Sequence, residues 1–313
     1  MVEHDSVLSP IEQEERRRLF WSIYILDRFV SCSKLRPPII LDADCQIQLP
    51  CEETDFREGR LQKTDILINV TTGKEQSTYI PGYFALVVLM ACALSRCSRY
   101  MLDNRHSSND VAPWDPKSEY VAIASVLLYY ESVSEIGDSL GDVVQQESLK
   151  LDGKIDQQKA GHMIFSKVLF HLNHCLLNHP FLLRQRIEAT KAKVPTTWLV
   201  RALKSGLEHA RSLSSIFRDA KNAGCIVSTS FYGYCLLIAG TVHALYTHSD
   251  DSNIQRESLE YLVSDLTYLD EVSKYWKNTA LIVRSFAHSP HPDLVPMLIL
   301  SRPGLGTSVL LGL

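Results

Sequence analysis

The sequence lacks the segments that mark export and membrane insertion. Glu3, His4 and Asp5 stand where a signal peptide would begin its apolar region. The longest apolar stretch, residues 83–94, has about a dozen residues and is followed by arginines, whereas a membrane span needs about 20 apolar residues. We therefore interpret this stretch as a buried core helix and expect no contact with a membrane.

The sequence also lacks paired cysteines. None of its eight cysteines stands in a C-x-x-C pair, and several lie inside apolar runs, such as Cys92 and Cys235. Without an export signal, we expect reduced thiols that pack as small apolar side chains. The spacing gives no six-cysteine zinc cluster, because such a cluster needs C-x2-C-x6-C-type spacing.

A basic surplus and the common catalytic motifs are missing as well. The net charge is −4, whereas a compact nucleic-acid binder usually carries a basic patch. There is no Gly-x-Ser-x-Gly, Gly-x-Gly-x-x-Gly or Walker loop. Asp42 and Asp44 lie in a turn-rich loop, where capping or turn-stabilising roles are favoured over acid/base chemistry. The sequence thus disfavours direct DNA binding by this chain and an enzymatic function.

One group of histidines has spacings that metal sites use. His171 and His174 share a side of a predicted helix, Cys175 is one turn after His171, and His162 and His179 lie nearby. No carboxylate accompanies them, and His-Glu-x-x-His is absent. We interpret them as packing or surface histidines, and we expect no cofactor and no metal ligand in this chain.

Helical periodicity is what the sequence does contain. It predicts an all-α fold, an irregular multi-helix bundle of about eight or nine helices, without convincing strands. The predicted helices span residues 9–35, 81–102, 118–136, 158–178, 181–189, 196–220, 228–248 and 254–277. Residues 280–287 are a possible continuation of the last helix, and residues 37–50, 51–78, 103–117 and 137–157 are predicted connections. We divide the chain into residues 1–50 and a continuous helical remainder, residues 51–313.

The first helix has the clearest start signal. Ser9 is a predicted N-cap, Pro10 occupies the first helical position, and Glu12 completes a capping box. A stripe at helical spacing predicts its buried face and consists of Leu19, Ile23, Leu26 and Val30. A second apolar set, which predicts contacts on more than one side, consists of Phe20, Trp21, Tyr24 and Ile25.

Three consecutive arginines in this helix allow three interpretations. Arg16, Arg17 and Arg18 point in different directions, because an α-helix turns by about 100° per residue. The favoured interpretation is that one of them pairs with Asp27, Asp42 or Asp44 and fixes the following loop to the helix. A surface for a partner or effector is the second interpretation. A DNA-phosphate patch is disfavoured, because neighbouring glutamates offset the charge.

Asp27 lies near the apolar face of the same helix. A buried carboxylate must be paired or hydrogen-bonded, so we expect an arginine partner for it. Arg28 and Arg36 are the nearest arginines in the sequence. We expect Asp27→Ala to destabilise the fold.

Two blocks carry a resemblance to a known family. Residues 14–28 read EERRRLFWSIYILDR, and residues 36–50 read RPPIILDADCQIQLP. They resemble the middle homology region of fungal zinc-cluster (Zn2Cys6) transcription factors, a basic-aromatic helix ending in Leu-Asp-Arg, a Gly-Arg-Pro loop, an aspartate-rich turn and a closing Leu-Pro. Residues 172–182 resemble the family's later Arg-Pro-Phe-Leu element, with His179 in place of arginine. Leu35 stands where the family usually has glycine.

The resemblance implies a nuclear regulator of RNA polymerase II transcription. The motif assigns structural or regulatory roles to Arg16, Arg17, Arg18, Trp21, Asp27, Arg28, Arg36, Pro37, Asp42, Asp44 and Pro50. It implies zinc and DNA contact only in an N-terminal cluster that is missing here, so the chain resembles a C-terminal regulatory portion. The implied partners are the transcription machinery or a related zinc-cluster factor, with a small-molecule effector as a further possibility. The alternatives are a truncated partner or decoy regulator, and an effector-binding helical module without DNA binding.

Overall fold

The all-α prediction is confirmed. The computed structural model describes residues 8–34, 36–60, 62–72, 80–102, 111–144, 150–151, 153–190, 192–277 and 279. Within these residues the chain forms eleven α-helices, two 3₁₀ turns and one small hairpin. The predicted continuation over 280–287 and part of the predicted connection over 103–117 lie outside the described residues.

Eight helices are long, and they agree with the predicted count and positions. They are α1 (Pro10–Lys34), α4 (Tyr83–Leu102), α5 (Glu119–Val133), α7 (Gln157–Leu177), α8 (Pro180–Thr190), α9 (Thr196–Asn222), α10 (Ser230–Tyr246) and α11 (Ser252–Ser273). Their ends carry the expected signals. The Ser9 hydroxyl accepts from the Glu12 amide at 3.3 Å, and the Glu12 carboxylate accepts from the Ser9 amide at 2.7 Å. Gly224 follows α9 with a φ of 78°, a conformation that favours glycine.

The short elements lie in segments that the sequence predicted as connections, except for the 3₁₀ turn Glu135–Gly137, which overlaps the end of the predicted helix 118–136. They are α2 (Glu53–Arg57), α3 (Leu67–Thr72), α6 (Leu140–Val144), the 3₁₀ turns Asp42–Asp44 and Glu135–Gly137, and the antiparallel strands β1 (Lys150–Leu151) and β2 (Lys154–Ile155). The prediction missed α2, α3, α6 and the hairpin, because five or six residues are too few to show a helical period. The predicted turn at Asp42–Asp44 is confirmed.

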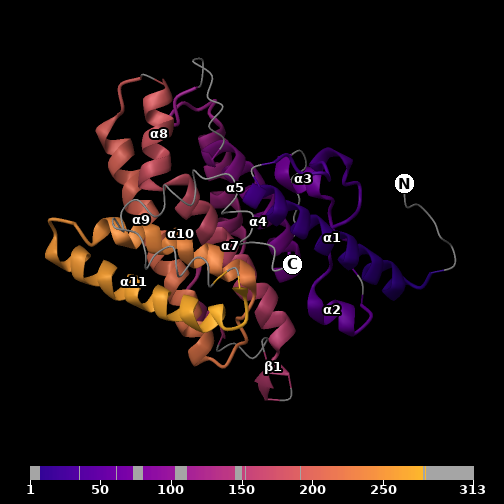
Figure 1. Cartoon of the computed structure of the whole chain (residues 1–313). Coiled ribbons are helices and arrows are strands. Elements are labelled where there is room, and N and C mark those ends of the chain that lie inside the picture. Colours follow the sequence, from indigo (N-terminus) through magenta and orange to yellow (C-terminus); the bar gives the residue numbers. More distant parts are fainter. Residues whose placement is uncertain are drawn as a thin grey trace.

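The helices pack around α7, which lies in the middle of the molecule. α7 packs against α4 on one side and against α9 and α10 on the other, while α11 covers α10. α1, α2 and α3 lie together at the side opposite α9 and α11 (Figure 1). α1 reaches the rest of the core through α4 and through a stacked pair, Phe29 and Phe231 of α10, whose ring centroids are 4.0 Å apart.

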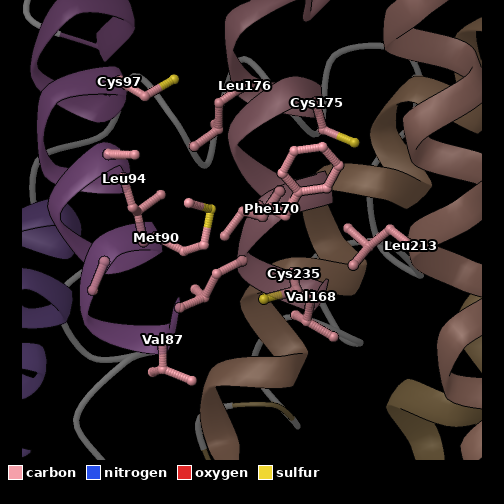
Figure 2. Close-up of a cluster of buried hydrophobic side chains, with 14 of the residues drawn as sticks. Val87, Met90, Leu94, Cys97, Val168, Phe170, Cys175, Leu176, Leu213 and Cys235 are labelled. Atoms are coloured by element: carbon pink, nitrogen blue, oxygen red, sulfur yellow. The ribbon is translucent and has the colours of Figure 1, made fainter. Parts of the chain in front are cut away.

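The apolar stretch in α4 forms the core and is long and apolar enough, by length and composition, to cross a membrane. However, 78% of its most apolar window is buried inside the molecule, as the sequence analysis predicted. Figure 2 shows side chains of α4 facing those of α7, with the labelled set Val87, Met90, Leu94, Phe170 and Leu176 among them. All eight cysteines are free and buried, which confirms their predicted packing as small apolar side chains.

The predicted buried face of α1 is wrong. Leu19, Ile23 and Leu26 are 63%, 51% and 56% exposed. The buried face instead contains Trp21 and Tyr24, both fully buried. The aromatic side chains remove more apolar surface from water than the aliphatic ones, so the helix turns them toward α4 and the loop.

Candidate functional site: the loop bound along α1

The residues of the predicted family motif form two polar networks that hold residues 36–53 against α1. We call them together the α1–loop network. The first network is centred on Asp27, whose side chain is only 8% exposed. Its Oδ2 accepts from the backbone amides of Ile39 at 2.9 Å and Ile40 at 3.1 Å. Asp27 is also paired with Arg28 at 3.2 Å and Arg36 at 3.4 Å, which confirms the predicted arginine partners.

Arg28 is fully buried and connects α1 with the start of the 3₁₀ turn. Its Nη2 donates to the Ile40 carbonyl and to Oδ1 of Asp42, both at 2.6 Å. The same Asp42 oxygen accepts from the Tyr24 hydroxyl at 2.6 Å, and the guanidinium lies 4.1 Å from the centre of the Tyr24 ring. A buried guanidinium is stabilised by such a combination of carboxylate, carbonyl and aromatic ring. Arg28 therefore fixes the loop to the helix.

The second network is centred on Glu14, which is fully buried. Its carboxylate pairs with Arg17 and Arg18 one turn later and accepts from the Cys51 amide at 3.0 Å. Arg18 also donates to Glu53 at 2.6 Å and to the Cys51 carbonyl at 3.0 Å. The same guanidinium lies 4.1 Å from the centre of the Phe56 ring. This network places α2 against the first half of α1.

Between the two networks, Trp21 binds the loop directly. Its indole Nε1 donates to the Gln48 carbonyl at 2.8 Å, and Arg17 donates to the Gln48 side chain at 3.1 Å. The loop continues into Leu49, whose amide donates to the Asp65 carbonyl at 2.8 Å, and then into Pro50, which is buried. Residues 48–50 are thereby held between α1 and the segment that leads to α3.

The predicted aspartate partners are wrong for Arg17 and Arg18, although the predicted effect on the loop is found. Arg17 and Arg18 pair with glutamates, and Arg28 pairs with Asp42. The reason is geometric. Residues 16–18 lie about two and a half to three turns before Asp27 on the helix, and Arg18 contacts Cys51 rather than the aspartate-rich turn.

Three predicted motif residues lie at the margin of the network. Arg16, Pro37 and Asp44 have exposed side chains. The capping or turn role predicted for the aspartates is wrong for Asp42, since its carboxylate accepts from α1 and makes no cap to its own turn. The structural and regulatory roles assigned from the motif stay predictions.

The sequence analysis missed three members of the network, Glu14, Tyr24 and Glu53. A signal was present for two of them. Glu14 precedes Arg17 and Arg18 by three and four residues, the spacing of helix ion pairs. Tyr24 precedes Arg28 by four residues, so the two share a helix face. No local pattern could have connected Glu53 with Arg18, which is 35 residues away.

A thiol of the core adjoins the network. The Cys92 Sγ lies 3.5 Å from Oδ2 of Asp42. Burial, together with the nearby negative charge of Asp42, raises the pKa of Cys92 to about 12. The thiol therefore stays protonated near neutral pH and donates to Asp42, so this side of the network offers no thiolate for metal binding or nucleophilic chemistry.

The histidine group does not come together as one site. His171 of α7 meets His209 of α9, with 2.8 Å between their Nδ1 atoms, and His174 stacks on His209. His179 instead contacts Thr241, and His162 stacks on Phe84. Burial is the main cause that lowers the pKa of His171, His174 and His209, which favours neutral rings. Among the residues that the structure describes, no group of three His, Cys, Asp or Glu side chains could hold a metal ion.

The fold and the α1–loop network define an all-helical domain with a long loop fixed along its first helix. Residues 2–137 match the fungal specific transcription factor domain. The match includes the whole α1–loop network and extends through α5. The predicted resemblance is confirmed.

Most of the chain is similar to the same class of proteins. The chain is 28% identical over 285 residues to the Zn(2)-C6 fungal-type transcription factor FTF1c of Fusarium oxysporum f. sp. lycopersici, covering 86% of this chain and 29% of that protein. The factor FTF2 of the same organism is 26% identical over 278 residues, with 86% and 25% covered.

A more distant relative comes from another fungus. An uncharacterized transcriptional regulatory protein of Schizosaccharomyces pombe is 22% identical over 314 residues, with 89% of this chain and 44% of that protein covered. The chain thus spans less than a third of the Fusarium factors it matches. No solved structure matches the chain.

Proposed function

We propose that this chain is the regulatory region of a nuclear fungal transcription factor that controls RNA polymerase II transcription. In this proposal it is not an enzyme, and DNA is bound only through a zinc cluster outside this chain. The transcription machinery or a related zinc-cluster factor is the proposed partner. The observation that carries the proposal is the family match over residues 2–137, which contains the α1–loop network.

The network supports a regulatory role because the charged side chains of α1 form ion pairs within the protein. Arg17, Arg18 and Arg28 are directed into ion pairs with Glu14, Glu53 and Asp42. These guanidinium groups are therefore engaged by the protein rather than by phosphates. A helix that holds two distant segments can transmit a shift of either segment to the core. The loop, α2 and α1 would then move together.

The test is a tethering experiment. The chain is fused to a heterologous DNA-binding domain and directed to an RNA polymerase II reporter gene. We expect reporter output several-fold above or below that of the DNA-binding domain alone. Asp42→Asn should change this output because it weakens the bond with Arg28, whereas the exposed Asp44→Asn in the same turn should not. Equal output from the fusion and the bare DNA-binding domain, at equal protein levels, would contradict the proposal.

A second candidate function is that of a partner or decoy that binds a related factor without binding DNA itself. The exposed stripe of α1, formed by Leu19, Ile23 and Leu26, favours it. Ile39 extends this apolar surface, since it is 76% exposed and its amide is bound to Asp27. The measurement is co-purification of a tagged zinc-cluster factor with the wild-type chain and with Ile23→Gln. Loss of the factor is expected for Ile23→Gln, while Glu15→Gln on the same helix should retain it.

A further inference from the structure

A cavity lies between α9 and α11, on the side of the molecule away from the α1–loop network. Its volume is about 230 Å³. α9 contributes Ser214 and Phe217, α11 contributes Asp265 and Tyr268, and Leu236 of α10 closes the back. The three helices lie side by side in Figure 1. None of these residues belongs to the part of the chain that matches the family.

Asp265 gives the cavity its chemistry. The residue is 2% exposed, and its Oδ2 accepts from the Ser214 hydroxyl at 2.9 Å. The nearest cationic candidate among the described residues is His243, whose Nε2 is 4.0 Å from the same oxygen. Burial lowers the pKa of His243 to about 4, so its ring is neutral near pH 7 and cannot balance a carboxylate.

The order of these three side chains excludes a hydrolytic triad. Ser214 lies between the other two residues, 2.9 Å from the Asp265 carboxylate and 3.1 Å from Nε2 of His243. In a catalytic triad the histidine lies between serine and carboxylate. Here the Ser214 hydroxyl donates directly to Asp265, so the histidine does not stand between the serine and the carboxylate. Asp265 is therefore a hydrogen-bond acceptor at the wall of a cavity.

The basic residues of the cavity wall, Arg218 and Lys221, contact groups other than Asp265. Lys221 Nζ lies 2.7 Å from Oε1 and 2.8 Å from Oε2 of Glu271, at the opposite end of the cavity wall. Arg218 contacts Ser215 at 3.2 Å and Asp219 at 3.5 Å. Ser214 and Lys221 are separated by seven residues of helix, about 10 Å. Among the described residues, the Asp265 carboxyl therefore has no cationic counter-ion.

The rest of the wall suits an organic cation. The rings of Phe217 and Tyr268 lie with their centroids 5.1 Å apart, and the Tyr268 hydroxyl is held by the Val227 carbonyl. Aromatic faces attract cations, and the apolar wall accommodates a short hydrocarbon chain. A hard metal ion would need about six oxygen ligands, whereas the wall presents two carboxylates, and Glu271 is already paired with Lys221. The volume corresponds to about eight water molecules at about 30 Å³ each, so the ligand must be small.

We propose that this cavity binds a small primary ammonium compound, with its charged nitrogen at Asp265 and its hydrocarbon part against Phe217 and Tyr268. Burial raises the pKa of Asp265 well above its ordinary value, and an ammonium group would supply the missing charge and return the carboxyl to its ionised form. The inference goes beyond the proposed function. It concerns a binding site and requires no particular effect on transcription.

The experiment uses the purified chain at pH 7.5 with 3-methylbutylamine as the probe and 3-methylbutan-1-ol as its neutral isostere. We expect the amine to raise the Tm by a few degrees in a saturable manner at millimolar concentration, and the alcohol to leave it unchanged. Isothermal titration calorimetry should give one site per chain. Since binding is measured without a reporter, failure here and failure of the tethering experiment are independent.

Variants separate this site from general effects of the amine. Asp265→Asn keeps the shape of the side chain and should abolish the shift, whereas Asp270→Asn, exposed on the same helix, should retain it. Ser264→Leu fills the cavity from an exposed position and should also abolish binding. An equal shift with the alcohol, an unshifted wild type, or an unchanged response in both Asp265→Asn and Ser264→Leu would overturn the proposal.

Discussion

Single side chains of α1 hold the loop mainly through its backbone. Asp27 accepts from two loop amides, Arg28 donates to the Ile40 carbonyl, and Trp21 donates to the Gln48 carbonyl. Buried backbone groups of an irregular segment need such partners, because no sheet or helix supplies them. Asp27 and Arg28 therefore each complete several hydrogen bonds that would be lost together, whereas Trp21 completes one.

Removing the Asp27 carboxylate should be costly. Asp27→Ala leaves the amides of Ile39 and Ile40 and part of the Arg28 charge without a partner. We expect a loss of about 1–3 kcal/mol in the free energy of unfolding, the cost of unsatisfied buried groups. Urea denaturation measures it, with Asp44→Ala as the exposed control in the same loop. Equal midpoints and slopes for Asp27→Ala and the wild type would contradict the network.

Buried histidines should make the fold sensitive to acid. His179 is fully buried, and burial lowers its pKa to about 4 from the ordinary 6.5. The unfolded chain therefore takes up the proton first, so stability is complete above pH 6.5 and falls as the pH drops toward 4. His179→Gln should reduce the slope of unfolding free energy against pH by about one proton, or about 1.4 kcal/mol per pH unit. Urea titrations at several pH values measure it, and an unchanged slope would contradict the assignment.

At the residue scale, the sequence analysis predicted some partners and missed others. The arginine partners of Asp27 follow from burial and short separation along the chain. The Arg18–Glu53 and Arg28–Asp42 pairs depend on where the loop returns, 35 and 14 residues away. The Ser214, His243 and Asp265 group joins three helices and has no local signal. Such contacts are set by tertiary packing rather than by sequence spacing.

At the scale of elements, two glycines inside helices differ in the space that is free for a side chain. A Cβ on Gly206 of α9 would lie 2.7 Å from the Asn178 carbonyl oxygen, which belongs to the backbone that ends α7. A Cβ on Gly161 of α7 would meet nothing within 4 Å. Gly206 therefore permits the close approach of α9 to the α7–α8 junction, while Gly161 serves no comparable contact.

This contrast gives a matched pair of variants. Gly161→Ala should stabilise the fold by about 0.5–1 kcal/mol, because alanine has the higher helix propensity. Gly206→Ala has the same propensity gain, but the clash with a backbone oxygen should outweigh it and destabilise the fold. Thermal unfolding of both variants measures the difference. A stabilised Gly206→Ala would show that α9 is packed less closely than described.

The helices were predictable because their periods, caps and breakers extend over many residues. α1 shows what the pattern leaves open. Its sequence is apolar on two faces, and the face that is buried depends on the aromatic residues and on the loop that α1 binds. The short α2 and α3 depend on that loop as well, so they had no independent signal.

At the scale of the whole molecule, ion pairs connect α2 with the start of α7. Arg57 pairs with Asp156, 99 residues later, and Lys159 pairs with Glu52 at 3.2 Å. These contacts join two parts of the chain at the surface, where α2 meets the start of α7. The α1–α2 region is also held to the rest of the molecule by the apolar contact between α1 and α4, and the ion pairs add to that contact.

This surface contact should depend on ionic strength. Arg57→Ala should lower the free energy of unfolding by up to about 1 kcal/mol in dilute buffer, because the Arg57 side chain is partly exposed. At about 0.5 M NaCl the difference between variant and wild type should shrink, since salt screens surface pairs. Urea denaturation at both salt concentrations measures it. A difference that grows with salt would point to lost packing instead of lost charge.

The way in which α1 holds its loop determines which loop residues can be substituted without loss of the contact to the helix. The groups that the helix recognises in residues 39–51 are largely amides and carbonyls, which every residue except proline supplies in full. Asp42 and Gln48 are exceptions, since their own side chains are bound. Saturation mutagenesis should therefore tolerate many replacements at Ile39 and few at Asp27. Partners could be discriminated by exposed loop side chains that vary freely while the helix beneath them stays the same.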